Sequence, residues 1–387
     1  MKRYDRQSRI SQFQERRRSE ALSRQRAARR NLTAQVRQLA LSEHSNAAFS
    51  AASQVQAPGD DSLTTSSSAH AGGEEVPTLL GTHGSGLRSF FSNQLMQHEW
   101  LTDIPGDLAS NWVVMPRPEG QRCLVIASHQ HTVSRTRSGS ILHSFPSPLP
   151  GGSRATHGNA EVFSILDTVF SEPDKTYFVI DIMAWNGYLL YDCNADFRTF
   201  WVQSKLAEIA EGIQAAYSGM APFQQRDGLL FLNREAHYDL GSSPLALLWK
   251  DAHSSRYFLD TDAAGVVPDW LHIVLQCLDN GHVGTGDDPP IIVGTVPQDL
   301  LQNKPDQSRH GRLLRFTVRE GGLILRDGEL VSADLRFEGL ANQRRGRADL
   351  CSKIVFQHLA RNNPITLAML LDVCGHSDSE LGDACKE

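Results

Sequence analysis

The sequence has six cysteines but no C-x-x-C pair, and no apolar run approaches the roughly 18 residues needed to cross a bilayer. The scattered cysteines argue against a zinc ribbon and against a disulfide-built scaffold, and they fit a reducing, intracellular compartment. The N-terminus lacks the apolar centre of a signal peptide. From these absences we predict a protein that is neither secreted nor embedded in a membrane.

Proline and glycine are absent between Arg3 and about Leu41, and the composition of this stretch favours one long helix. Twelve of the first 40 residues are Lys or Arg and three are acidic, so this arm carries about +9, and the whole-chain charge of −6 leaves about −15 for the rest. Its apolar face is small, so we expect the arm, residues 1–42, to stay mobile until a partner orders it. A solvated charged helix and a nonspecific RNA-binding tail are the alternatives.

Aromatic residues are scarce from 43 to 86, where Ser, Ala, Thr and Gly predominate, and this composition predicts a disordered linker. We place a globular domain at 87–280, an extension of it at 281–375 and a disordered tail at 376–387. Strands are predicted at Asn111–Met115, Gln121–Ser128, Val162–Phe170, Thr176–Ala184, Gly228–Leu232, Leu245–Trp249, Arg256–Leu259, Ile291–Val296, Leu313–Val318 and Gly322–Leu325. Helices are predicted at Ser89–Trp100, about Thr199–Ala216 and Asp349–Ala360. The fold class is therefore α+β with antiparallel sheets.

A short basic motif precedes one predicted strand: Arg117-Pro118-Glu119-Gly120-Gln121-Arg122. It resembles the K-x-D-G-x-R motif of covalent nucleotidyltransferases, the messenger-RNA capping enzymes and ligases, with Arg117 in place of the lysine. In those enzymes the lysine amine attacks the α-phosphate, whereas a guanidinium stays protonated and cannot attack. The resemblance implies a binding pocket without its catalyst, and a simple Pro-Glu-Gly turn is the alternative.

Further segments follow in the order of that superfamily. Ile165-Leu166-Asp167-Thr168-Val169 stands where the enzymes have a strand ending in D-G-E, with Val169 replacing the carboxylate. Asp227-Gly228-Leu229-Leu230-Phe231 resembles their D-G-L-x-F strand, and Leu247-Leu248-Trp249-Lys250 resembles the strand with the final pocket lysine. Asp327-Gly328-Glu329 falls out of this order and is predicted to be a β-turn. Together these segments imply a nucleotidyltransferase (mRNA capping enzyme)-like fold.

A second set of motifs runs from about Asn93 to Trp249: Asn93-Gln94-Leu95-Met96, Glu99-Trp100-Leu101, Asp103 to Leu108, Leu149-Pro150-Gly151-Gly152, Tyr191-Asp192-Cys193, Asp196-Phe197-Arg198 and Ser204-Lys205-Leu206. These resemble the snurportin family, non-enzymatic adaptors that import capped spliceosomal RNPs into the nucleus. At the other end, Ser11-Gln12-Phe13 and the arginines through Arg30 resemble an importin-β-binding helix.

The resemblance implies recognition of the 2,2,7-trimethylguanosine (m3G) cap of small nuclear RNAs. A methylated guanine carries a delocalised positive charge, so stacking on tryptophan is a natural way to hold it. Trp100 matches a cap-site tryptophan of the family, and Arg137 stands where the family has a lysine facing the cap phosphates. His98 and Arg117 stand where the family pattern has serine and cysteine.

Trp249 is the residue we predict to stack on the cap. It follows Pro244 by five residues, whereas the family pattern has four, and a one-residue slip on a strand moves a side chain to the opposite face. We assign Trp112, Trp185 and Trp201 to the core. The pair His129 and His131 lacks companion ligands at useful spacing and is predicted to lie in an exposed loop, so we expect no metal site.

The sequence thus predicts a nuclear import adaptor that shuttles between nucleus and cytoplasm, with no catalytic residues and no cofactor. Its expected partners are m3G-capped snRNPs, importin-β and, by implication of the family, an export receptor. An active nucleotidyltransferase or cap-processing enzyme and a general RNA-binding protein with a basic tail are the alternatives. The residues expected to bind importin-β are Arg16, Arg17, Arg18, Arg24, Arg26, Arg29 and Arg30.

Overall fold

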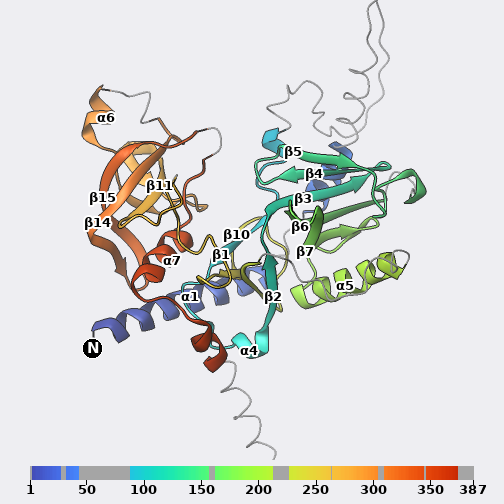
Figure 1. Cartoon of the computed structure of the whole chain (residues 1–387), viewed down its shortest axis with the longest axis horizontal. Coiled ribbons are helices and arrows are strands. Elements are labelled where there is room, and N and C mark those ends of the chain that lie inside the picture. Colours follow the sequence, from blue (N-terminus) through green and yellow to red (C-terminus); the bar gives the residue numbers. More distant parts are fainter. Residues whose placement is uncertain are drawn as a thin grey trace, which may run out of the picture.

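The computed structural model describes residues 2–27, 32–42, 88–156, 162–211, 226–262, 264–303, 309–343 and 346–373. Within these ranges the chain forms three sheets in two units (Figure 1). The two-sheet unit holds a six-stranded and a four-stranded sheet, and the C-terminal unit holds a five-stranded sheet. No helix of the described ranges is both long enough and apolar enough to span a membrane.

The six-stranded sheet is antiparallel throughout, in the order β5-β4-β3-β6-β7-β8. Side chains alternate between its faces, so Leu124 and Ile126 point into the core between the two sheets, while Val125 packs on the opposite face beneath α5. Both faces are therefore covered. The elements are β3 (Gln121–Ser128), β4 (His131–Thr136), β5 (Ile141–Phe145), β6 (Phe163–Ser171), β7 (Thr176–Trp185), β8 (Tyr188–Leu189), a 3₁₀ turn (Arg154–Thr156) and α5 (Ala195–Glu211).

The four-stranded sheet has the order β1-β10-β9-β2, with one parallel pair, β1 with β10. One face contributes Met96, Leu232 and Ala246 to the core shared with the six-stranded sheet. The other face packs on α4 and on the C-terminal helix at 367–373. The elements are β1 (Met96–Trp100), α4 (Leu108–Asn111), β2 (Trp112–Pro118), β9 (Arg226–Asn233) and β10 (Gly241–Trp249).

The C-terminal unit is built on the antiparallel order β13-β12-β11-β14-β15. A Cβ added at Gly294 on edge strand β13 would lie 2.9 Å from Leu335 on the opposite edge strand, so the sheet curls until its edges meet. The elements are β11 (Leu271–Cys277), a 3₁₀ turn (Asp279–Gly281), β12 (His282–Gly284), β13 (Ile292–Thr295), α6 (Gln298–Asn303), β14 (Leu313–Arg326), β15 (Glu329–Leu340) and α7 (Cys351–Asn362).

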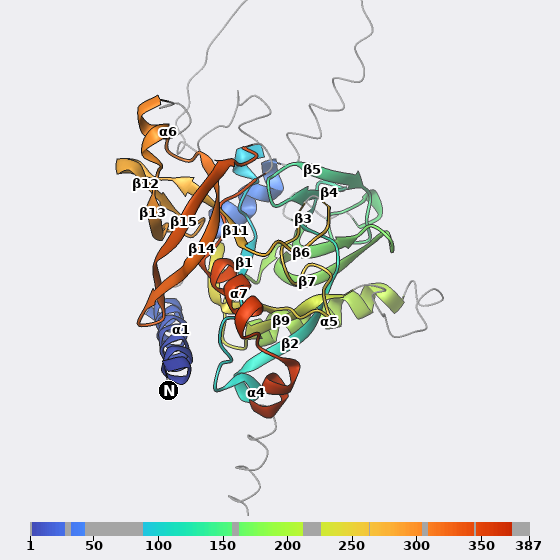
Figure 2. The same cartoon turned by 60° about the vertical axis from the view of Figure 1, so that its left-hand side comes forward.

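The arm is packed against both units, which corrects the prediction that it stays mobile. Its main helix, α1 (Lys2–Ala27), runs beneath the four-stranded sheet and reaches the β14–β15 turn (Figures 1 and 2), where a Cβ at Gly328 would lie 2.5 Å from the Arg9 carbonyl oxygen. A second helix at 33–42 follows, with Leu32 outside it, so one continuous helix is not formed.

Two kinds of contact compensate for the small apolar face of the arm. The stripe Leu32, Val36 and Leu39 lies in the core of the two-sheet unit. Along α1, Arg17 pairs with Glu99 at 2.6 Å, and Arg18 pairs with Asp103 at 2.9 Å in a site where both side chains are less than a tenth exposed. Buried ion pairs were not part of the prediction from the apolar pattern, and they explain why it was wrong.

The antiparallel α+β class is confirmed, and β3 has the predicted bounds. Two element assignments are wrong: residues 96–100 form β1 instead of the end of a helix, and Arg256–Leu259 lie in a turn. The predicted boundary at 280 is also wrong, because β11 at Leu271–Cys277 already belongs to the C-terminal sheet. The predicted linker at 43–86 and the tail at 376–387 lie outside the described residues.

Candidate functional site: a cation-rich cluster at the seam of the two units

A carboxylate at the start of β9 anchors the first part of the site. Asp227 accepts hydrogen bonds from Arg117, from Lys250 at 2.5 Å and from the Ser255 hydroxyl at 2.5 Å. The next residue, Gly228, has φ +96°, and a Cβ there would overlap the carbonyl oxygen of Trp249. The Asp-Gly pair thus lets β9 approach β10 closely while the carboxylate turns toward the pocket.

A second carboxylate, on β6, anchors the opposite wall. Asp167 is fully buried and accepts a two-pronged hydrogen bond from Arg122, with Nε at 2.9 Å, and a third bond from the Tyr238 hydroxyl at 2.6 Å. Burial and the Asp167 charge hold the pKa of Tyr238 well above its ordinary value, so its hydroxyl remains a donor. The two hydrogen bonds to Asp167 fix the orientation of the Arg122 guanidinium.

Arg117 cannot act as a nucleophile in this setting. Burial and the neighbouring Arg122 lower its pKa to about 10, which still leaves it protonated at neutral pH. Burial and then Arg117 lower the pKa of Lys250 to about 7, but the Asp227 carboxylate at 2.5 Å opposes that shift by favouring the ammonium ion. An ammonium paired with a carboxylate has no free lone pair for attack on a phosphate.

His98 lies on β1 beside Arg117 and Arg122, and its side chain is buried, with 9 % of the residue exposed. Burial, with Arg122 and Arg117, holds its pKa well below the ordinary value, so the ring is neutral at physiological pH. Its Nδ1 lies 3.4 Å from Arg122 Nη1. Because a guanidinium can only donate, Nδ1 is the acceptor in this contact.

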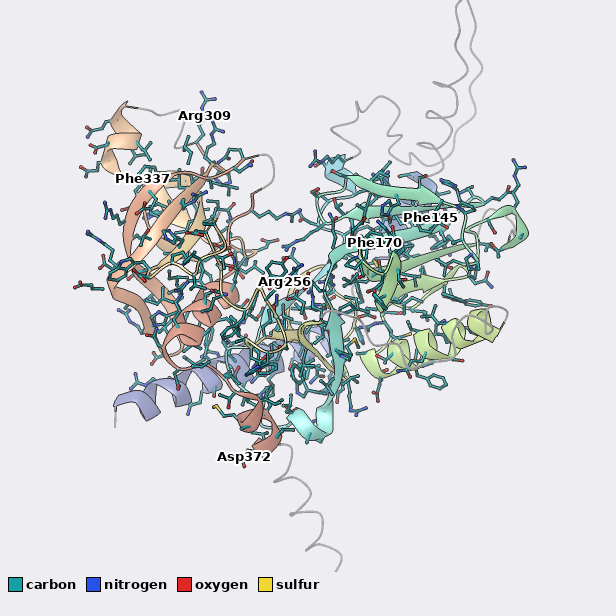
Figure 3. All side chains as sticks on the ribbon, in the orientation of Figure 1. Phe145, Phe170, Arg256, Arg309, Phe337 and Asp372 are labelled. Carbon is teal, nitrogen blue, oxygen red and sulfur yellow. The ribbon has the colours of Figure 1, made fainter. Side chains whose placement is uncertain are left out.

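Trp100, at the end of β1, is half-buried at the seam between the two units. The Phe356 ring of α7 lies 4.8 Å from it between centroids, and Lys250 Nζ lies 5.1 Å from the indole centroid. Arg256, which Figure 3 labels in the same seam, pairs with Glu119 of the motif turn. Trp100 thus lies beside Lys250, and its predicted part in cap binding stays a prediction.

Trp249 does not reach the pocket, so its predicted stacking role is contradicted. It is 2 % exposed, packs with Leu101 and Trp112 on the outer face of the four-stranded sheet, and donates its Nε1 hydrogen to the Ile365 carbonyl at 2.9 Å. Leu248 holds the pocket-facing position, in the same cluster as Trp100. The extra residue after Pro244 has turned the tryptophan to the other face.

Arg137, between β4 and β5, lies near Arg122 and Arg347. It donates to the Gln97 side chain, and its Nε is buried without a hydrogen-bond partner among the described residues. Burial, Arg347 and Arg122 lower its pKa to about 10. The sequence motifs located Arg137, but nothing in them pointed to Arg347, which approaches from a segment 210 positions later.

The other predictions for individual residues can be placed as well. Trp112 is buried in the cluster on the outer face of the four-stranded sheet, and Trp185 in the cluster between the six-stranded sheet and α5, as predicted. Trp201 of α5 is half-buried against the Trp185 cluster. His129 lies in the β3–β4 turn and His131 begins β4, and both are half-buried, so the predicted exposed loop is wrong for this pair. Within the described ranges no group of potential metal ligands is found.

The arm arginines differ in their surroundings. Arg17 and Arg18 form the pairs described above, Arg26 pairs with Glu235 at the surface, and Arg16 lies 3.8 Å from Glu20. Arg24 is exposed. Arg29 and Arg30 lie outside the described residues.

Part of the chain that contains this site matches a known protein family. Residues 94–224 match the family model described as Snurportin1, m3G cap-binding domain. The match spans Trp100, Arg117, Arg122, Arg137 and Asp167, and it confirms the resemblance to snurportin over that segment.

Two solved structures are similar at a low level. The ligase domain of LigD from M. tuberculosis has 16 % identity and a TM-score of 0.28, covering 64 % of this chain and 93 % of its own. A mycobacterial DNA ligase D complexed with ATP and MES has 12 % identity and a TM-score of 0.29, covering 66 % of this chain and 97 % of its own.

Proposed function

We propose that this chain binds the 2,2,7-trimethylguanosine cap of spliceosomal small nuclear RNAs and carries the capped particles into the nucleus with importin-β. The observation that carries the proposal is the match of residues 94–224 to the snurportin cap-binding domain, because that segment supplies most of the pocket. Shuttling between cytoplasm and nucleus, with return by an export receptor, belongs to the same proposal.

The chemistry of the pocket supports a cap ligand. The methylated base is cationic and stacks on Trp100, taking the place of the Phe356 ring and so exchanging one aromatic contact for another. The phosphates that follow it are anionic and lie toward the arginines. Methylation of the exocyclic amine removes donors from the pairing edge, so stacking and charge dominate over edge hydrogen bonds.

The same pocket supports a carrier in preference to an enzyme. A nucleotidyl transfer through a lysine needs a neutral amine at the position of Arg117, and the nearest lysine, Lys250, is paired with Asp227. Incubation with labelled GTP and a divalent metal is the direct check on this point. A covalent adduct would favour the enzyme.

Trp100→Ala is expected to weaken binding of a trimethylguanosine-capped dinucleotide by roughly 5- to 150-fold, because base–aromatic stacking contributes about 1–3 kcal/mol per base. Isothermal titration calorimetry measures the affinity without depending on tryptophan fluorescence. Trp270→Ala, the same substitution at a tryptophan of the C-terminal unit that is 48 % exposed, is the matched control and should leave the affinity unchanged. Equal binding by Trp100→Ala and the unmodified chain, or equal binding of trimethylated, monomethylated and unmethylated caps, would contradict the cap assignment.

For the arm, we expect a peptide of residues 1–42 to bind importin-β with an affinity that falls steeply as salt is raised. Charge-assisted arginine contacts would dominate that interaction, and salt screens them. Fluorescence anisotropy of a labelled peptide at low and high ionic strength measures the effect. If the peptide instead binds any RNA as well as it binds importin-β, the arm is a general RNA-binding tail.

A further inference from the structure

The segment between β15 and α7 brings an arginine of the C-terminal unit to the edge of the pocket. Arg347 donates from Nη1 to the Asn93 side chain at 2.6 Å and from Nη2 to the Arg137 carbonyl oxygen at 2.9 Å. Its side chain is otherwise exposed. Two hydrogen bonds thus hold the guanidinium in one direction, although it comes from a different unit of the fold.

The same contact places two like charges together. Burial, then Arg347 and Arg122, disfavour the charged form of Arg137 and lower its pKa. Within the described residues, the side-chain partners of Arg137 and Arg347 are the amides of Gln97 and Asn93, and neither partner is a carboxylate. Since the Nε of Arg137 is buried and has no acceptor there, its hydrogen-bonding capacity is unfilled.

The cations of the wider cluster differ in their partners. Asp167 and Asp227 accept from three cations of the cluster, whereas the two guanidiniums described above have no carboxylate partner among the described residues. His98 is neutral and adds no further cation. The cations are Arg117, Arg122, Lys250, Arg137 and Arg347.

We propose that Arg347 joins Arg137, the residue at the position of the family's phosphate-facing lysine, in holding the phosphate bridge of a 5′–5′ linked cap, so that the C-terminal unit supplies part of the ligand site. The inference deepens the proposed cap-binding function and rests on it. A phosphate bridge is anionic and so complements two guanidiniums that lack a carboxylate partner among the described residues. Arg347 uses two of its five N–H groups on Asn93 and the Arg137 carbonyl, so three remain for phosphate oxygens.

Arg347→Gln tests the site, with Arg319→Gln as control because Arg319 is an exposed arginine of the same unit on β14. Three probes are titrated by calorimetry: inorganic tripolyphosphate, the trimethylguanosine-capped dinucleotide and the trimethylguanosine nucleoside. We expect Arg347→Gln to weaken the first two by about tenfold and to leave the nucleoside within about twofold. The slope of log affinity against log salt should fall by about 1 for the two phosphate-bearing probes.

Two results would overturn the inference. One is unchanged tripolyphosphate binding in Arg347→Gln; the other is an equal loss for all three probes, which would mean that Arg347 only supports the fold. Thermal unfolding of both variants checks that they are folded. The test separates the two proposals. Binding of tripolyphosphate through Arg347 does not depend on methylation, so it bears on the phosphate site. Equal binding of methylated and unmethylated caps would count against the cap function alone.

Discussion

Replacing Arg198 by methionine should destabilise the two-sheet unit by about 3–5 kcal/mol, the largest loss we expect from a single substitution. Arg198 lies in the first turn of α5 and is fully buried. It donates to both oxygens of Asp181 on β7, at 2.8 and 3.0 Å, and to the carbonyl oxygens of Cys193 and Ala236 at 2.5 and 2.8 Å. Methionine leaves a buried carboxylate and two carbonyls without their donor.

Urea denaturation measures this loss as a shift of the midpoint at unchanged slope. Arg234→Gln is the matched control, because its pair with Asp196 is about half exposed and should contribute about 0–1 kcal/mol. The double variant Arg198→Met with Asp181→Asn should lose less than the sum of the two single losses, since both substitutions remove the same pair. A loss below about 1 kcal/mol for Arg198→Met would show that the pair does not support the fold.

Much of the sheet structure follows from local sequence, and the exceptions have physical causes. β3 alternates between two buried faces and is bounded by turn residues, so its limits were predictable. The segment Met96–Trp100 has residues that favour helix, yet it forms β1 because it pairs in parallel with β10. Pairing of that kind depends on a strand about 145 positions away and leaves no local signal.

Some residues of the candidate site could likewise be predicted from the sequence, and others could not. The motifs singled out Trp100, Arg117 and Arg137, and the part of each in binding a ligand stays a prediction. Trp249 was misassigned because a single inserted residue reverses the face of a strand, and no pattern within β10 shows whether a bulge restores it. Arg347 could not be found from the sequence, because its role depends on how the C-terminal unit packs on the two-sheet unit.

The buried pair between the arm and the two-sheet unit makes the second large prediction. Asp103→Asn removes the charge that holds Arg18 while leaving every residue of the arm unchanged. Glu15 of the arm remains beside Arg18, but its side chain is 62 % exposed, so the substitution removes the buried counter-charge of the Arg18 guanidinium at a cost of up to about 3–5 kcal/mol. The arm avoids that cost by detaching, so we expect α1 to be cleaved by trypsin at least about 100-fold faster in this variant.

Glu235→Gln is the control, because it also removes an ion pair between arm and unit, but one in which both side chains are more than half exposed. That pair should contribute about 0–1 kcal/mol, so cleavage should change little. If the arm also binds importin-β, the Asp103→Asn chain should bind it nearly as tightly as the free arm peptide does, whereas the unmodified chain should bind more weakly. Equal cleavage rates for both variants would mean that the buried pair does not hold the arm, whatever the outcome with importin-β.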